Sequence, residues 1–159
     1  MRKYSSNRLV RLSIVASVYV VLTLGLGFMS FGGIQFRIAE ALMLLCFYKK
    51  DYGISLIVGC LIANMFSPMF LMDMLFGTLA TAIAVLLIYI SPNIYVASLA
   101  PVLTNAFIIS AELKYFYGLP YWLGAFEVAL GEFVCVSILG VMLFKSLEKN
   151  KRFIELITK

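Results

Sequence analysis

The sequence has 159 residues, of which 63% are hydrophobic and 13% are charged, and it contains no histidine. Soluble domains carry about 25% charged residues, so this composition excludes an ordinary soluble domain and predicts one integral membrane domain over residues 1–159. The missing imidazole disfavours zinc enzymes and histidine-dependent catalysts, so we expect neither enzyme activity nor a metal site.

Six apolar segments follow one another along the chain, separated by short loops that contain glycine, proline or charged residues. A helix rises 1.5 Å per residue and needs about 20 residues to cross a bilayer, so the chain has room for six short spans. The predicted spans cover residues 9–28, 36–48, 54–66, 73–90, 94–113 and 121–144. We therefore predict an all-α membrane protein, a compact bundle of six transmembrane helices, in which the short second or third span is extended, tilted or re-entrant.

The distribution of lysine and arginine predicts how the bundle is oriented in the membrane. Six spans place nearly all of the basic residues on one side, in the two terminal segments and around Lys49 and Lys50, and only Arg37 and Lys114 on the other. Cytoplasmic loops carry the excess of lysine and arginine, so we predict that both termini are cytoplasmic. The net charge of +5 is then explained by topology, with lipid headgroups and not nucleic acid as counter-ions.

Several charged and amide side chains fall within the predicted spans or close to the non-cytoplasmic side. A charged group in a membrane costs about 2.5–3.5 kcal/mol on insertion scales, so such groups normally face the bundle interior and pair or bind a ligand. Some have local explanations: Arg37 and Glu40 are spaced to pair with each other, Asp73 is placed to cap a helix, and amides can join helices. The candidates for an acidic, amide-lined pocket open to the outside are Arg37, Glu40, Asn64, Asp73, Asn105, Glu112, Glu127 and Glu132.

Aromatic residues accompany these charges near the predicted outer mouth. Trp122 lies close in sequence to Tyr115, Tyr117 and Tyr121. Two interpretations stay open, because such residues form interfacial belts in most membrane proteins and can also stack on a planar ligand. Cysteines Cys46, Cys60 and Cys135 show no C-x-x-C spacing, and we interpret them as inert packing thiols.

Four stretches of the chain carry a specific pattern. They are Phe31–Leu42 (FGGIQFRIAEAL), Gly59–Asn64 (GCLIAN), Asp73–Thr81 (DMLFGTLAT) and the pair Gly131 and Glu132. In this order they resemble the QueT family of queuosine-precursor transporters, which are substrate-binding (S) components of energy-coupling factor (ECF) importers. The similarity spans nearly the whole chain.

The resemblance implies capture of a 7-deazapurine such as preQ1, preQ0 or queuine from outside. It also implies a transmembrane coupling subunit and two ATPase subunits as partners. The chain itself has no G-x-x-x-x-G-K-[ST] phosphate loop. We therefore expect no cofactor in this chain and expect that only the partner subunits use ATP. A carboxylate would accept hydrogen bonds from the ring N–H and exocyclic amine, and an aromatic ring would stack on the face. We expect the pocket to use Trp122 and the eight charged and amide residues named above, among which Glu127 is a reserve candidate.

S components generally dock through small residues of the first helix. Here the nearest match is Ser13 and Ser17 with Ala16. Three alternatives to the queuosine-precursor interpretation remain: an S component for a vitamin-like molecule, a membrane enzyme using Glu112 and Glu132 as acid and base, and a structural subunit whose polar residues only join helices.

Overall fold

The computed structural model describes residues 6–27 and 36–158, and every element in these two ranges is helical. In chain order the elements are α1 (Ser6–Gly25), the 3₁₀ helix η1 (Ile38–Leu44), α3 (Leu45–Tyr48), α4 (Tyr52–Asn64), α5 (Phe70–Met72), the π-helix η2 (Asp73–Gly77), α6 (Thr78–Tyr89), α7 (Ile94–Tyr117), α8 (Tyr121–Glu132), the π-helix η3 (Phe133–Gly140), α9 (Val141–Leu147) and α10 (Lys151–Thr158).

Several of these elements join into longer continuous helices. Four helices within the described ranges are long and apolar enough to cross a membrane, namely Ser6–Gly25, Phe70–Tyr89, Ile94–Tyr117 and Tyr121–Leu147. The apolar helices Ile38–Tyr48 and Tyr52–Asn64 are shorter. The all-helical prediction is confirmed, as is the expectation that the second and third apolar segments are the short ones.

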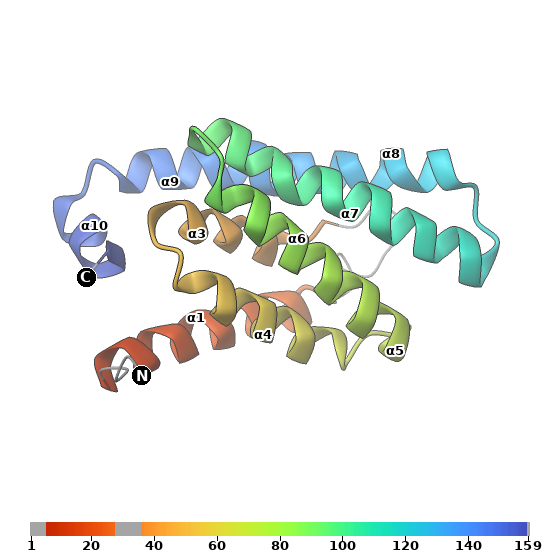
Figure 1. Cartoon of the computed structure of the whole chain (residues 1–159), viewed down its shortest axis with the longest axis horizontal. Helices are drawn as coiled ribbons and strands as arrows, with labels where there is room; N and C mark the ends of the chain where they lie inside the picture. The colour runs from red at the N-terminus through yellow and green to blue at the C-terminus, as the bar shows by residue number, and fades with distance from the viewer. Residues whose placement is uncertain (1–5, 28–35, 159) are drawn as a thin grey trace.

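The helices form two packed pairs joined through the middle of the bundle (Figure 1). Helix α1 packs along α4 on one side, α7 packs against α8 on the other, and α6 contacts both α4 and α7. Helix η1 lies between these pairs and contacts α1, α7 and η3. The main apolar core takes residues from α1, η1, α3, α4, α6, α7, η3 and α9, so the helices that carry the polar residues described below are held by it.

Helix α7 is the longest regular helix of the described chain, and a capping residue stands at each of its ends. The Asn93 side chain caps its start by accepting a hydrogen bond from the Val96 N–H at 2.9 Å. Gly118 ends it in the left-handed conformation with φ of 68°, which glycine adopts without steric cost. The predicted end at residue 113 was therefore four residues too early, because Leu113–Tyr117 continues the helix up to this cap.

A short C-terminal helix, α10, was not predicted. Its apolar side chains Phe153, Ile154 and Ile157 pack against the core. Phe153 and Ile157 also help to line an apolar cavity of about 240 Å³, together with residues of α1 and α9. The last backbone carbonyls of α10 accept hydrogen bonds from side chains of other elements. Arg11 donates to the Leu156 carbonyl, Lys49 to the Thr158 carbonyl and Tyr52 to the Ile157 carbonyl.

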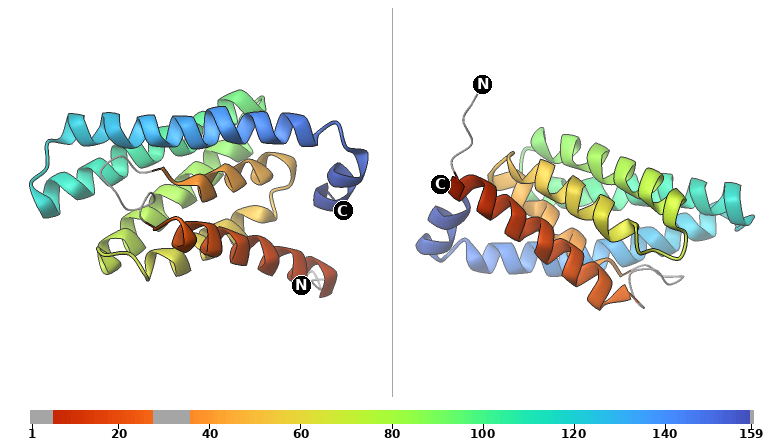
Figure 2. Two further views of the ribbon diagram at one scale, coloured as in Figure 1. Left: turned by 180° about the vertical axis from the view of Figure 1, so that it is seen from behind. Right: turned by 90° about the horizontal axis from the view of Figure 1, so that it is seen from below.

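These contacts bring the start of α1 and the end of the described chain to one end of the bundle (Figures 1 and 2). Arg8 also pairs with Asp51 at this end, and Lys145 pairs with Glu148. Basic residues of the described chain that the sequence assigned to one side of the membrane, Arg8, Arg11, Lys49 and Lys145 among them, thus lie at one end of the molecule.

Candidate functional site

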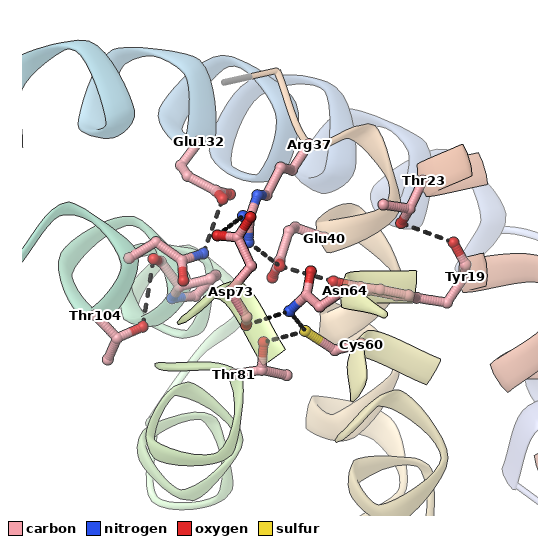
Figure 3. Close-up of polar contacts among 12 residues, drawn as sticks. Tyr19, Thr23, Arg37, Glu40, Cys60, Asn64, Asp73, Thr81, Thr104 and Glu132 are labelled. Carbon is pink, nitrogen blue, oxygen red and sulfur yellow. Dashed lines mark hydrogen bonds and ion pairs between the residues drawn. The ribbon is translucent and has the colours of Figure 1, made fainter. Parts of the chain in front are cut away.

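Three irregular helical segments contribute to a set of buried polar side chains in the interior (Figure 3): η1 packs against η3, and Asp73 of η2 reaches Arg37. Glu40 lies in the 3₁₀ helix η1, Asp73 begins the π-helix η2, and Glu132 immediately precedes the π-helix η3. All three carboxylates are at most 2% exposed. Since π-helical turns occur frequently at functional sites, this convergence marks the region as the candidate site.

Arg37 lies at the centre of the group and is 3% exposed. Its Nη1 is 3.9 Å from Glu40 Oε1, and its Nη2 is 4.0 Å from Asp73 Oδ1. Both separations exceed hydrogen-bond distance, and Nε and Nη2 have no hydrogen-bond partner within the described part of the chain. The guanidinium therefore balances charge while keeping donors available.

Each of the two glutamates is held by one donor. Tyr19 of α1 donates to Glu40 Oε1 at 2.8 Å, and Asn105 of α7 donates to Glu132 Oε1 at 2.8 Å. The second oxygen of each glutamate accepts no hydrogen bond from any described residue. The carboxylates are thus oriented through one oxygen while the other is left for a further donor.

A second layer of hydrogen bonds fixes Asp73 and Asn64. The Asn64 amide donates to the Asp73 carbonyl at 2.8 Å and to Cys60 Sγ at 3.3 Å, while Thr81 donates to Cys60 Sγ at 3.2 Å. The Ser67 hydroxyl donates to the Asp73 carboxylate. These bonds tie α4 to the helix that contains η2, as expected for an amide that joins helices.

Gly77 allows this close approach. A Cβ atom added at Gly77 would lie 2.6 Å from Asn64 Nδ2 and 3.9 Å from Arg37 Nη1. No side chain fits at that distance without moving Asn64, so the glycine is needed for the packing of η2 on α4.

Unsatisfied acceptors dominate the cluster. Among described residues, the buried charged groups are one guanidinium, on Arg37, and four carboxylates, on Glu40, Asp73, Glu112 and Glu132. The buried carboxylate and amide oxygens without a donor among described residues are Glu40 Oε2, Glu132 Oε2, Asn105 Oδ1 and both oxygens of Glu112. Buried polar groups in native proteins are normally hydrogen-bonded, so this excess fits a ligand that brings several N–H donors.

The chain was then compared with known proteins. The family model described as QueT transporter matches residues 9–149. A Lactococcus lactis subsp. cremoris (strain MG1363) protein named queuosine precursor transporter QueT is 32% identical, over 94% of this chain and 97% of that protein. The chain belongs to the QueT transporter family. No solved structure matches it.

Membership in the QueT family makes this chain a transporter and not an enzyme. Its apolar helices make it a multi-pass membrane protein. The resemblance found in the sequence motifs is thereby confirmed, and the enzyme alternative based on Glu112 and Glu132 is excluded.

Within this QueT-family fold, most of the predicted site residues come together. The buried ones are Arg37, Glu40, Asn64, Asp73, Asn105, Glu112 and Glu132. The predicted pair of Arg37 and Glu40 exists, but it is part of the larger cluster. Asp73 is not a helix cap, because it lies inside the continuous helix Phe70–Tyr89.

Two predicted residues lie apart from the cluster. Trp122 is 76% exposed and contacts Tyr121 edge to face, with ring centroids 5.0 Å apart. Ten residues separate it from Glu132, which is about 15 Å along a helix. Glu127 is half-buried on α8. The nearby residues Lys114, Tyr115 and Tyr121 line an open groove of about 570 Å³ that is separate from the buried cluster.

Four residues that hold the site were not predicted from the sequence: Tyr19, Cys60, Ser67 and Thr81. Cys60 was interpreted as a packing thiol, and it is buried, but it accepts two hydrogen bonds in the site. The sequence offered one indication for Cys60 and Thr81, because both residues lie inside the stretches that resemble the family. Tyr19 had no such signal.

The three residues predicted to dock a partner divide between two faces of α1. Ser13 and Ser17 are exposed, whereas Ala16 faces α4, where a Cβ at Gly59 would lie 3.1 Å from the Ala16 carbonyl oxygen. The exposed face also carries Ile14, Val18 and Val21.

Proposed function

We propose that this QueT-family chain is the substrate-binding membrane subunit of an importer for a queuosine precursor, a 7-deazapurine such as preQ1, preQ0 or queuine. The observation that carries the proposal is the buried cluster in which acceptor oxygens exceed donors. The printed name of the Lactococcus relative supports the substrate class.

The cluster suits the polar edge of a 7-deazaguanine. That edge presents a ring N–H and an exocyclic amine side by side, and these can donate to the unpaired oxygens of Glu132, Glu40 and Asn105. The carbonyl on the same edge can accept from the two unpaired nitrogens of Arg37. Such charge-assisted bonds are about twice as strong as neutral ones and set the orientation of the ring.

We further propose six membrane crossings, with both termini in the cytoplasm of the cell and the cluster open toward the outside. The two short helices Ile38–Tyr48 and Tyr52–Asn64 then complete the count of six with the four long ones. Basic side chains gathered at the end that holds α10 support this orientation.

Energy for transport is proposed to come from a separate coupling subunit and two ATPase subunits of an ECF importer. The sequence lacks a phosphate-binding loop, so ATP hydrolysis requires other chains. Helix α1 offers the docking face, because only Tyr19 and Thr23 are buried on it and its apolar side chains are exposed next to Ser13 and Ser17.

The substrate is tested by thermal stabilisation of the detergent-purified protein. A ligand that binds only the native state raises apparent stability, by about 2.7 kcal/mol at a hundredfold excess over Kd. We expect stabilisation by preQ1, preQ0 or queuine but not by riboflavin, thiamine or biotin. Stabilisation by a vitamin would overturn the substrate, and no response to any compound would favour a structural subunit.

Energisation is tested by uptake of labelled 7-deazapurine into cells that make the chain alone or with a coupling subunit and ATPases. We expect uptake only with the complete set, and its loss when the phosphate-loop lysine of the ATPases is replaced. Equal uptake by the chain alone would contradict the ECF proposal while leaving the substrate assignment intact.

A further inference from the structure

Glu112 on α7 is the least satisfied polar side chain in the described part of the molecule. It is 0% exposed, and neither of its oxygens has a hydrogen-bond partner among described residues. Glu40 and Glu132 differ from it, because Tyr19 and Asn105 each hold one of their oxygens. Burying an unpaired carboxylate costs much more than burying a paired one, so the position calls for a cationic partner.

Arg37 does not fill that role. Glu112 lies close enough to interact electrostatically with Arg37 and Asp73. However, the ion pairs that Arg37 forms within 4.0 Å are with Glu40 and Asp73. One guanidinium thus serves two other carboxylates, and none of the ion pairs within 4.0 Å in the described part of the chain involves Glu112.

The position of Glu112 on α7 relates it to the pair of Asn105 and Glu132. Glu112 follows Asn105 by seven residues, which is two helical turns on the same face and about 10.5 Å along the axis. That axial spacing is comparable to the length of a two-ring heterocycle with a one-carbon substituent. Between Asn105 and Glu112 lies Ile109, which forms an apolar cluster with Leu113 and Val128.

We propose that Glu112 binds a primary ammonium group carried by the transported solute, at the end opposite the Asn105 and Glu132 pair. The assignment rests on the proposed function and adds a basis for choosing among 7-deazapurines. An aminomethyl substituent supplies a positive charge and three N–H donors to the two free oxygens of Glu112. A nitrile at the same place supplies no donor and leaves the carboxylate unpaired.

The apolar neighbours strengthen this selectivity. Ile109, Leu113 and Val128 are at most 8% exposed, so water is kept away from that side of the carboxylate. Charge-assisted hydrogen bonds gain strength in such a low-dielectric setting, and unpaired charges become more costly there. Glu112 thus favours the amine and disfavours its uncharged analogues.

The test compares the affinities of 7-aminomethyl-7-deazaguanine and 7-cyano-7-deazaguanine by titration calorimetry on the detergent-purified full chain. We expect the wild type to bind the aminomethyl compound at least tenfold more tightly. Glu112→Gln should remove this preference, chiefly by weakening the binding of the aminomethyl compound, and Glu112→Asp, which keeps the charge, should retain part of it. Glu155→Gln, the same change at an exposed carboxyl on α10, serves as the control.

Several results would overturn the assignment. An unchanged preference in Glu112→Gln would place the ammonium elsewhere, and an equal loss for both compounds would make Glu112 a structural residue. Sodium-dependent stabilisation that Glu112→Gln abolishes, without ligand, would make the site a cation site. If neither compound binds the wild type, the proposed function fails along with the assignment. Should Glu112→Gln not fold, Glu112→Asp carries the comparison, because a preference that is at least partly retained in that variant supports the assignment and its complete loss opposes a charge-based contact.

Discussion

At the scale of single residues, two carboxylates of the site, on Glu40 and Glu132, are each fixed through one oxygen. Tyr19 and Asn105 orient Glu40 and Glu132, and the remaining oxygens point to a shared interior with Arg37 (Figure 3). Orientation by a protein donor reduces the entropy that a ligand must overcome on binding. The unpaired oxygens then supply the specific contacts.

Glu132→Gln tests this division of roles. The glutamine oxygen can still accept the hydrogen bond from Asn105, so we expect the variant to fold and to melt close to the wild type. The lost charge weakens the contact to a donor-rich ligand, and affinity for 7-deazaguanine should fall tenfold or more. Calorimetric titration measures this, with Glu155→Gln as the control; equal affinities in all three proteins would remove Glu132 from the site.

Sequence reasoning found the charged residues because charge inside an apolar segment is costly and therefore conspicuous. It did not find Tyr19, because a tyrosine in a hydrophobic helix resembles an ordinary core residue until its hydroxyl partner is known. It also grouped Trp122 with the charges, since both lie near the same predicted mouth, whereas Trp122 is 76% exposed and turns away from the interior.

At the scale of elements, the departures from regular helix lie where the site lies. The 3₁₀ helix η1 and the π-helices η2 and η3 carry or adjoin Glu40, Asp73 and Glu132. None of these irregularities was predicted from the sequence, because a uniformly apolar segment has the same composition whether its hydrogen bonds span three, four or five residues. The six apolar segments themselves were predicted, since their loops contain proline, glycine or charge.

Gly77→Ala tests the packing of η2 on α4. The added methyl group would lie 2.6 Å from Asn64 Nδ2, so Asn64 must move and the cluster around Asp73 must shift with it. We expect a lower melting temperature and a ligand affinity reduced by about tenfold, since displaced site residues lose hydrogen bonds. Gly25→Ala, where nothing lies within 4 Å of the new methyl group, should change neither quantity.

Tyr19→Phe tests whether α1 contributes to the site in addition to its exposed face. A hydrogen bond to a charged group contributes about 1.5–3 kcal/mol, and its loss frees Glu40 from its fixed orientation. We expect a loss of affinity of about tenfold, measured by ligand-induced thermal stabilisation. Tyr95→Phe, at an exposed tyrosine of α7, is the matched control. Wild-type affinity in Tyr19→Phe would show that Glu40 needs no such support.

At the scale of the whole molecule, the end with α10 is held by polar contacts between distant parts of the chain. Arg11, Lys49 and Tyr52 bind the last carbonyls of α10, and Tyr48 donates to Glu148 at 2.8 Å. Helix α10 escaped sequence prediction because it is only 8 residues long and charged, which resembles a basic tail. Its apolar side chains stabilise the helix only by packing against the neighbouring helices, which the local sequence does not reveal.

Glu148 makes the stability of this end depend on pH. Hydrogen bonds from Lys145 and Tyr48 lower the pKa of the Glu148 carboxyl below its ordinary value of 4.5. A lowered pKa in the folded state stabilises the protein above that ordinary value, and the contribution is lost as the pH falls through the lowered pKa. The melting temperature of the wild type should therefore exceed that of Glu148→Gln by a small amount above pH 4.5, and the two should converge in stronger acid. A difference that persists at low pH would contradict this.

The central claim is that a 7-deazapurine binds within the buried cluster around Arg37. Titration calorimetry of the nanodisc-embedded protein with 7-aminomethyl-7-deazaguanine tests it most directly, using the wild type and a double variant, Glu40→Gln with Glu132→Gln. The account predicts saturable one-to-one binding to the wild type and loss of at least a hundredfold in affinity in a double variant that melts like the wild type. Undiminished binding by that variant would place the ligand elsewhere, and no binding by the wild type would contradict the account as a whole.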